Sequence, residues 1–302
     1  MLRIRIVLRS PPGKRKEHTS AMEGIEPGAL YLVATPIGNL GDISARAEQT
    51  LRGVDFIAAE DTRVTRKLLE HLSIKKPMVS YYEHNRKESG EKILSRLLSG
   101  ESCALVTDAG TPGISDPGQD LVETCSGAGI LTIIIPGPCA AVSALTLSGL
   151  PAGRFTFEGF LSTARKSRFD HLNELKTEKR TMIFYEAPHK LQRTLSDMLG
   201  IFGDRRISLS RELTKVFEET MRCTFSEAID HFDLVPPRGE FVLVIEGAKD
   251  DLPAGTDINE ALSAANIYIK GGASLKDAVK KAAELTGVPK NTLYNLMIKK
   301  PG

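Results

Sequence analysis

Four consecutive residues in the first third of the chain combine two acids with a base, Glu60-Asp61-Thr62-Arg63. They follow a short apolar run at 56–59, so we expect them at the carboxyl end of a β-strand, where open α/β sheets bind ligands. A carboxylate there could act as a general base toward a hydroxyl group, and an arginine could hold a phosphate. Asp61 and Glu60 are therefore the candidate general bases, and Arg63 is the candidate residue for binding a phosphate or a hydroxyl group. Capping of a helix at 62–71 by Asp61 is the competing interpretation.

Three loops rich in glycine and proline follow apolar runs of the same kind. They are 35–39 (TPIGN), 108–118 (DAGTPGISDPG) and 136–138 (PGP). Glycine lets the backbone approach a ligand closely and offer its amides and carbonyls as fixed polar groups. One such loop is equally well explained as a tight turn. Three of them on consecutive crossovers indicate a ligand site.

The motifs that the sequence lacks restrict the ligand. It contains no GxGxxG and no GxxxxGK[ST], so neither a dinucleotide fold nor a phosphate-binding P-loop is indicated. It also contains no GxSxG and no HExxH. A nucleoside-like or zwitterionic small molecule is the more plausible occupant of the three loops.

The elements that position these loops are visible in the hydropathy pattern. Continuous apolar runs alternate with amphipathic segments, as in a parallel sheet covered on both faces. Strands are predicted at 29–35, 56–59, 79–82, 103–107 and 131–135, each followed by a helix.

Beyond a linker at 149–153, strands follow one another with fewer helices, which predicts an α+β domain with a mixed sheet. Helices are expected there at 166–176, 191–199 and 226–232. The predicted domains are a disordered basic extension at 1–27, an N-terminal α/β domain at 28–149, an α+β domain at 150–248 and a small helical segment at 257–302.

The formal net charge of +2 conceals an uneven distribution. Residues 1–21 hold six Lys and Arg against one acid, and residues 270–302 hold seven Lys against two acids. The 248 residues between them hold 27 basic and 35 acidic groups. The body of the protein is therefore not expected to bind a polyanion through bulk charge, whereas both ends could contact nucleic acid locally.

The four cysteines show no CxxC or metal-ligand spacing and lie mostly in apolar runs. The N-terminus lacks a continuous signal-peptide core. The most apolar stretch, 130–150, is interrupted by Pro136 and Pro138 and cannot form one spanning helix. We expect a cytoplasmic protein with reduced thiols, no metal site and no membrane association.

Seven blocks of sequence carry a family resemblance. They are LVATPIGNLGDISARA (32–47), AEDTRVTR (59–66), VTDAGTPGISDPG (106–118), IPGPCAA (135–141), FYEAPHKL (184–191), SRELTK (210–215) and AAELTGVPKNTLY (282–294). The chain resembles the tetrapyrrole-methylase superfamily of S-adenosyl-L-methionine enzymes. Within it, the chain is most similar to the group that methylates the ribose 2′-oxygen in small-subunit ribosomal RNA. The N-terminal extension departs from that group.

The resemblance implies two α/β domains of the class III methyltransferase type, with the cofactor S-adenosyl-L-methionine in the cleft between them. It also implies a homodimer. The contacts from the second domain would come from the backbone around 184–187. Carried over by position, the cofactor-binding residues are Pro36, Asp108, Gly110, Thr111, Pro112, Ile114, Ser115, Pro136, Pro138, Phe184 and Glu186.

The C-terminal segment 274–300 has the rhythm of a helix–turn–helix with a break at Gly287. Its lysines fit an RNA-docking surface, because phosphate contacts supply affinity without reading sequence. A solvated helix face explains the same charges equally well. The candidate RNA-binding residues are Lys276, Lys280, Lys281, Lys290, Lys299 and Lys300.

The resemblance implies 2′-O-methylation of a cytidine ribose in the decoding region of 16S ribosomal RNA. The expected partner is the small ribosomal subunit. Two alternatives stay open. One is a methylase of a tetrapyrrole or another small molecule, and the other is a non-catalytic RNA-binding assembly factor.

Overall fold

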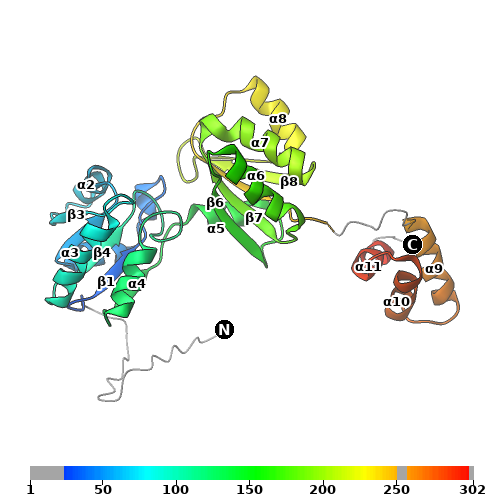
Figure 1. The fold of residues 1–302 in the computed structure, drawn as a ribbon, viewed down its shortest axis with the longest axis horizontal. Coiled ribbons are helices and arrows are strands. Elements are labelled where there is room, and N and C mark those ends of the chain that lie inside the picture. The colour runs from blue at the N-terminus through cyan, green and yellow to red at the C-terminus, as the bar shows by residue number, and fades with distance from the viewer. Residues whose placement is uncertain (1–23, 250–256, 299–302) are drawn as a thin grey trace, which may run out of the picture. The chain divides into compact units, whose positions relative to one another are not determined.

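The computed structural model describes residues 24–249 and 257–298. Most of the expected extension at 1–27, together with Lys299 and Lys300, lies outside the described residues. The chain divides into a first unit, which runs to Ser143 and includes Glu212–Glu218, and a second unit from Ala144 onward. Each unit contains one five-stranded sheet (Figure 1).

The first sheet is entirely parallel, in the order β3-β2-β4-β1-β5. Its strands are β1 (Leu30–Val33), β2 (Phe56–Ala59), β3 (Met78–Ser80), β4 (Cys103–Val106) and β5 (Thr132–Ile135). The helices after them are α1 (Ala45–Gly53), α2 (Thr62–His71), α3 (Arg86–Leu98), α4 (Gln119–Gly127) and α5 (Ala140–Ser148). The predicted alternation of strands and helices is confirmed.

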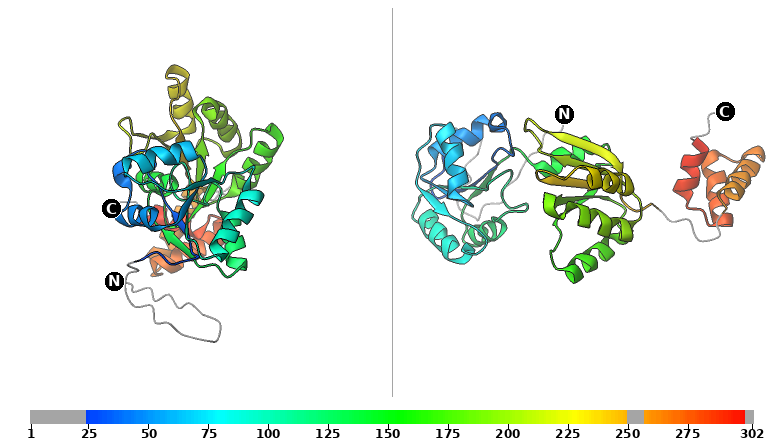
Figure 2. Two further views of the ribbon diagram at one scale, coloured as in Figure 1. Left: turned by 90° about the vertical axis from the view of Figure 1, so that its left-hand side faces the viewer. Right: turned by 90° about the horizontal axis from the view of Figure 1, so that it is seen from above.

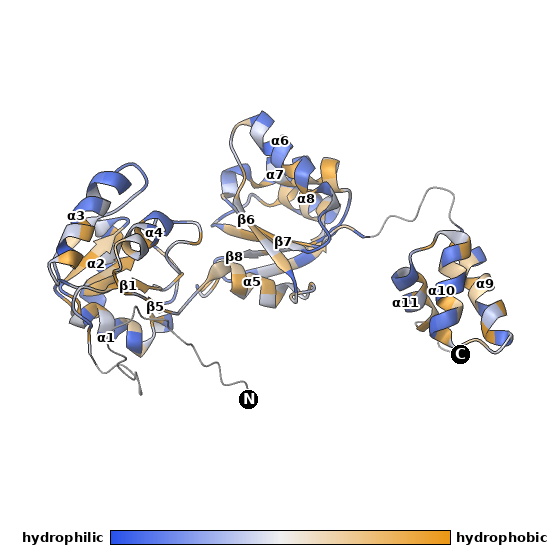
Figure 3. Cartoon of the chain, turned by 60° about the horizontal axis from the view of Figure 1, so that its bottom comes forward, coloured by the Kyte–Doolittle hydropathy of each residue, from blue (hydrophilic) through white to orange (hydrophobic). Residues whose placement is uncertain are grey.

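Both faces of the first sheet are buried, as the continuous apolar strands require. Side chains of α1 and α2, among them Leu51 and Leu68, pack on one face with Tyr31 and Ile57. Side chains of α3 and α4 pack on the other face with Leu30. Figure 3 shows strands that are mostly hydrophobic and helices that carry both kinds of surface. The core therefore fixes the strand ends, and the loops after them are free to bind a ligand.

The second sheet is mixed, in the order β6-β7-β10-β8-β9, and this confirms the predicted mixed sheet. Only the β6–β7 pair is parallel. The strands are β6 (Phe155–Phe160), β7 (Thr181–Glu186), β8 (Arg206–Arg211), β9 (Glu219–Thr224) and β10 (Phe241–Ile245). One face is covered by α6 (Arg165–Glu174), α7 (Pro188–Phe202) and α8 (Phe225–Leu234).

Helix α7 is longer than the predicted 191–199 at both ends. Pro188 occupies its first turn, where a fixed φ and a missing N–H are favourable. Gly203 ends it with φ of 74°. The expected helix at 166–176 is α6 followed by a short 3₁₀ turn at Leu175–Thr177.

Three helices form the C-terminal part: α9 (Ile258–Lys270), α10 (Leu275–Thr286) and α11 (Lys290–Ile298). The right-hand view of Figure 2 shows them packed on one another. Asp257 and Ser274 cap the first two helices. Gly287 ends α10 in the left-handed conformation, at the break that the sequence predicts. Among the described residues, no helix combines the length and the apolarity that crossing a bilayer needs.

Candidate functional site

The carboxyl ends of the five parallel strands lie side by side at one edge of the first sheet. Ala59 pairs with both Ser80 and Val106, and Val33 pairs with Ile135. Neighbouring strands are about 4.8 Å apart. The loops that leave β3, β2, β4, β1 and β5 are therefore neighbours in that order, and we call this row of loops the carboxyl edge.

The three glycine- and proline-rich loops are joined to one another at the carboxyl edge. The Thr35 N–H donates to the Gly110 carbonyl at 2.9 Å, and the Gly110 N–H donates back at 3.1 Å. The Thr111 hydroxyl donates to the Pro138 carbonyl at 3.0 Å. Three loops separated by up to a hundred residues thus form one continuous surface, as a common ligand site requires.

Gly110 is the point at which these loops meet most closely. Its φ of 85° lies in the left-handed region, where a Cβ is unfavourable. A Cβ built there would lie 3.4 Å from Ile37 Cγ2 and 3.6 Å from the Pro138 oxygen. A methyl group fits that space, so conformational strain rather than a clash explains the need for glycine.

The remaining predicted cofactor residues of the first unit differ in their exposure. Pro112 is buried under the loop, while Pro36 and Pro138 are partly buried. Ile114 is an exposed large apolar side chain, half of its surface being accessible. It offers apolar surface at the carboxyl edge. The exposed members of the set are Asp108, Ile114, Ser115 and Pro136.

Hydrogen bonds join Glu60 and Asp61, which follow β2, to Asp108, the first residue of the glycine-rich loop after β4. The Asp108 N–H donates to Glu60 Oε2 at 3.3 Å, and the Asp61 N–H donates to Asp108 Oδ1 at 3.1 Å. Burial raises the pKa of Glu60, and the nearby charges of Asp116, Asp108 and Asp61 raise it further. Burial likewise raises the pKa of Asp108. A carboxylate with a raised pKa is a stronger proton acceptor than an ordinary one.

Asp61 has a different environment from its neighbour. It caps α2 by accepting from the Arg63 N–H at 2.8 Å, and its carboxylate pairs with the Arg63 guanidinium at 2.6 Å. These hydrogen bonds lower the pKa of Asp61 to about 2. The capping role that competed with catalysis in the sequence is therefore present, and Arg63 stands exposed beside it.

Sequence reasoning missed Thr107, the last residue before the glycine-rich loop. Its Oγ1 is buried and has no hydrogen-bond partner among the described residues. Buried hydroxyls are nearly always paired, so an unpaired one at a strand end points to a missing partner. Its position directly before Asp108 was the available signal, but a threonine in an apolar strand has an ordinary packing explanation.

A loop from later in the chain, Glu212–Glu218, belongs to the first unit. The Asn39 N–H donates to Thr214 Oγ1 at 3.0 Å. A Cβ on Gly38 would lie 2.5 Å from Lys215 Cγ, so only glycine allows this approach. The loop therefore covers part of the 35–39 loop at the carboxyl edge.

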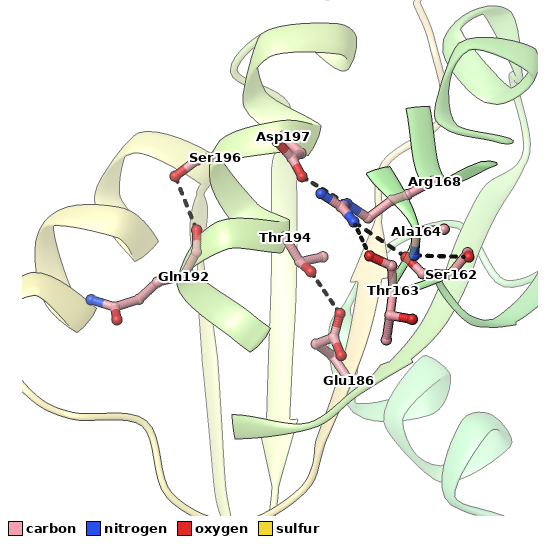
Figure 4. A network of polar contacts seen from close by, with 9 residues as sticks. All are labelled: Ser162, Thr163, Ala164, Arg168, Glu186, Gln192, Thr194, Ser196 and Asp197. Carbon is pink, nitrogen blue, oxygen red and sulfur yellow. Dashed lines mark hydrogen bonds and ion pairs between the residues drawn. The ribbon is translucent and has the colours of Figure 1, made fainter. Parts of the chain in front are cut away.

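The two predicted cofactor residues of the second unit have buried side chains. Phe184 packs in the core of that unit. The Glu186 carboxylate accepts from the Thr194 hydroxyl at 2.6 Å (Figure 4). It also accepts from the Ala187 N–H at 2.9 Å. Both side chains are committed to the fold, so any cofactor contact from this segment would come from its backbone.

The same figure shows a buried ion pair that holds the loop after β6 (Figure 4). Arg168 donates to Asp197 Oδ2 at 2.8 Å and to the carbonyls of Ser162 and Thr163 at 3.3 and 3.2 Å. The Arg168 side chain is only 4% exposed. The ion pair and hydrogen bonds of Arg168 thus hold α6, α7 and the loop between β6 and α6 together.

The candidate RNA-binding lysines of the tail are exposed on α10 and at the start of α11. Lys276 and Lys280 are one helical turn apart and so share a face. The Lys281 ammonium lies 5.6 Å from the centre of the Tyr268 ring. The described members of the set are Lys276, Lys280, Lys281 and Lys290.

Two protein-family profiles match this chain. The profile of the family "Tetrapyrrole (Corrin/Porphyrin) Methylases" matches residues 29–229. The profile "RsmI C-terminal HTH domain" matches residues 271–300. The two matched ranges contain all seven blocks of sequence that carry the family resemblance.

Curated relatives named "Ribosomal RNA small subunit methyltransferase I" match almost the whole chain. The protein of Synechocystis sp. is 48% identical over 273 residues, covering 90% of this chain and 98% of its own. That of Bacillus subtilis is 47% identical, with coverage of 89% and 93%. That of Escherichia coli O157:H7 is 44% identical, with coverage of 95% and 100%.

Solved structures are similar in fold at much lower identity. One is a uroporphyrin-III C-methyltransferase from Thermus thermophilus complexed with S-adenyl homocysteine, with a TM-score of 0.52 and 16% identity; it covers 72% of this chain and 97% of its own. Another is the methyltransferase CobJ, with a TM-score of 0.56, 18% identity and coverage of 73% and 95%. With curated relatives this similar and a profile match this long, the chain belongs to the tetrapyrrole (corrin/porphyrin) methylase family, in the group whose members are named ribosomal RNA small subunit methyltransferase I.

Proposed function

We propose that this chain transfers a methyl group from S-adenosyl-L-methionine to the 2′-oxygen of a cytidine ribose in 16S ribosomal RNA. The names of its relatives support small-subunit ribosomal RNA as the acceptor. The observation that carries the reaction is the hydrogen bond between Glu60 and Asp108, because it holds a proton acceptor against the glycine-rich loop.

The residues at the carboxyl edge fit the proposed cofactor. Glu60, Asp61 and Asp108 meet there with Asp116 nearby, and the Arg63 guanidinium pairs with Asp61. Negative charge of this kind favours a sulfonium cation. The unpaired Thr107 hydroxyl offers a hydrogen bond to a polar ligand, and Gly110 lets the backbone approach it closely. Ile114 would supply apolar contact for an adenine ring.

The bound cofactor would supply a methyl group on a sulfonium that needs no further activation. The chain's own task is therefore to position the acceptor, an effect worth about 7–11 kcal/mol in well-oriented reactions. A ribose hydroxyl ionises far above neutral pH, so a base is needed. Glu60 Oε1 or Oε2 would accept the 2′-hydroxyl proton, and the exposed Arg63 would hold an adjacent phosphate.

We further propose that Lys276, Lys280, Lys281 and Lys290, with Lys299 and Lys300, hold the RNA through phosphate contacts. The chain would work in the cytoplasm as a homodimer, which the family resemblance supports. Sedimentation of the purified protein would test the dimer directly.

Acceptor selection tests the proposed function. Methyl-labelled S-adenosyl-L-methionine is incubated with the protein and either small ribosomal subunits or free tetrapyrrole. Label on subunit RNA is the expected result. Label on the tetrapyrrole alone would refute the proposal, and retention of RNA without label anywhere would favour an assembly factor.

A further inference from the structure

The loop that follows β3 is fixed from the inside by a buried tyrosine. The Tyr81 N–H donates to the Ala59 carbonyl at 2.8 Å, which ties the loop to the end of β2. The Tyr81 hydroxyl donates to Asp120 Oδ1 at 2.8 Å. Only 1% of Tyr81 is exposed, so its ring anchors the loop in the core.

Asn85 closes the same loop. Its Oδ1 accepts from the Tyr82 N–H at 2.8 Å, and its Nδ2 donates to the Ser80 carbonyl at 3.0 Å. Its own N–H donates to the Tyr82 carbonyl at 3.0 Å. Together with the two bonds of Tyr81, these hydrogen bonds fix the backbone of residues 81–85 in one conformation.

Two of the side chains that this fixed loop exposes are aromatic, and the Glu83 side chain between them is exposed as well. Tyr82 is 41% exposed, and His84 is exposed beside it. Their ring centres are 6.2 Å apart at an angle of 86°. In an edge-to-face pair, the edge of one ring covers one face of the other, so further ring faces stay open. A fixed, exposed pair of this kind contributes little to a core and presents flat surfaces for stacking.

The position of the pair along the carboxyl edge sets its relation to the proposed reaction. β3 is the edge strand, and its end lies one strand spacing from Glu60. The glycine-rich loops lie on the other side of Glu60, after β4, β1 and β5. The proposed base thus stands between the cofactor loops and the aromatic pair.

Positive charge lies on the helix that joins β2 to β3. Helix α2, which connects β2 to β3, starts at the carboxyl edge and exposes Arg63, Arg66 and Lys67. Residues three and four apart share a helix face, so these cations lie together. Proteins hold single-stranded nucleic acid by combining a positively charged surface with exposed aromatic rings.

We propose that Tyr82 and His84 form a stacking platform for an unpaired RNA base at or next to the methylated nucleotide. The inference rests on the proposed function and deepens it by naming the residues that receive the acceptor. Stacking on these rings would hold the nucleotide on the β3 side of Glu60, while α2 would contact the adjacent phosphates. The platform would act on RNA binding and not on cofactor binding.

The test uses Tyr82→Ala and Tyr82→Phe in the full chain. The probe is a single-stranded RNA with the sequence around the methylated cytidine, carrying 2-aminopurine at successive positions. Stacking quenches this fluorophore, so wild-type protein should quench it at one or two positions. Removal of one base–aromatic stack predicts about 5- to 150-fold weaker RNA binding for Tyr82→Ala, while Tyr82→Phe keeps both quenching and affinity.

Phe155→Ala is the matched control, because Phe155 is 42% exposed but starts β6 in the second unit. It should change neither quenching nor RNA affinity. Calorimetry of S-adenosyl-L-methionine binding should give the wild-type Kd for all three variants and also show that they are folded. Unchanged quenching in Tyr82→Ala, or equal losses in Tyr82→Phe, would overturn the platform.

This outcome is separable from the proposed function. If wild-type protein methylates subunit RNA and Tyr82→Ala does so with an unchanged KM for RNA, the platform is wrong while the activity stands. If wild-type protein binds the probe with quenching but transfers no methyl group, the platform stands and the activity is wrong.

Discussion

Replacing Gly110 with alanine tests the cofactor loop through conformational strain alone. At φ of 85° an alanine costs about 1–2 kcal/mol relative to its preferred conformations. The nearest atoms lie 3.4 and 3.6 Å from the new methyl group, so no steric clash adds to this cost. The unliganded loop can relax by leaving the left-handed region. That relaxation breaks the paired hydrogen bonds between Thr35 and Gly110.

Cofactor binding would then have to restore the original loop, and the strain would appear in the dissociation constant. A cost of about 1–2 kcal/mol corresponds to a Kd about 5- to 30-fold higher. Gly110→Val places two further methyl groups next to Ile37. A β-branched residue also disfavours a positive φ more strongly than alanine does. We expect Gly110→Val to abolish measurable binding without unfolding the protein.

The assay is calorimetric titration of S-adenosyl-L-methionine, with Gly129→Ala as the control. Gly129 has φ of 72°, and a Cβ there would meet no atom within 4 Å. It lies between α4 and β5, at the opposite edge of the sheet from the loops. The control carries the same strain and should bind the cofactor with the wild-type Kd. Wild-type cofactor affinity in Gly110→Ala and Gly110→Val would refute the assignment of this loop to cofactor binding. Equally weakened binding in Gly110→Ala and Gly129→Ala would show that the strain acts through the general stability of the protein.

Three further predictions concern other parts of the chain. Glu60→Gln should lower kcat about 10²- to 10⁴-fold, because it removes the proposed proton acceptor. Because the pKa of Glu60 is raised, the wild-type rate should fall as the pH drops through that raised value. A rate that stays constant on the acid side would contradict this role. Ending the chain at residue 249 should leave cofactor binding unchanged but reduce the salt dependence of RNA binding. The slope of log affinity against log salt concentration should fall by about 0.7 for each phosphate that the tail no longer neutralises. An unaltered slope would mean that the lysines of the tail are only solvated. Arg168→Met should destabilise the protein by about 3–5 kcal/mol in urea unfolding, because it leaves the Asp197 carboxylate unpaired. Arg168→Met with Asp197→Leu should recover much of this stability, and an equally unstable double variant would show that the ion pair is not its source.

The strands and helices of both units were predictable because their patterns are local. The continuous apolar run at 56–59 placed β2 at the bounds that the structure has. The ends of α7 were not predicted, because capping by Pro188 and Gly203 extends a helix beyond its amphipathic part. Local chemistry therefore predicts which elements form and is less reliable about where they stop.

The order of strands in the sheet was not predictable in the same way. Leu30 pairs with Cys103 on one side and with Thr132 on the other, and nothing in its neighbourhood encodes either partner. The bridge between Thr35 and Gly110 depends on that order. The sequence could therefore name three candidate loops but not show that they are joined.

The electrostatic difference between Glu60 and Asp61 also depended on three-dimensional structure. The two acids are adjacent in sequence and were ranked together as candidate bases. Burial and the charge of Asp108 act on Glu60, whereas Arg63 pairs with Asp61. Groups in the loop after β4 and on α2 thus shift the pKa values of the two acids in opposite directions, and the sequence alone does not bring these groups together.

Nucleoside analysis of the methylated product tests the central claim most directly. Small subunits lacking the modification are incubated with the protein and methyl-labelled S-adenosyl-L-methionine, and the purified 16S ribosomal RNA is digested to nucleosides. Label is expected in 2′-O-methylcytidine with wild-type protein, and strongly reduced label with Glu60→Gln. Label in a base-methylated nucleoside, or subunit RNA that remains unlabelled, would contradict the claim.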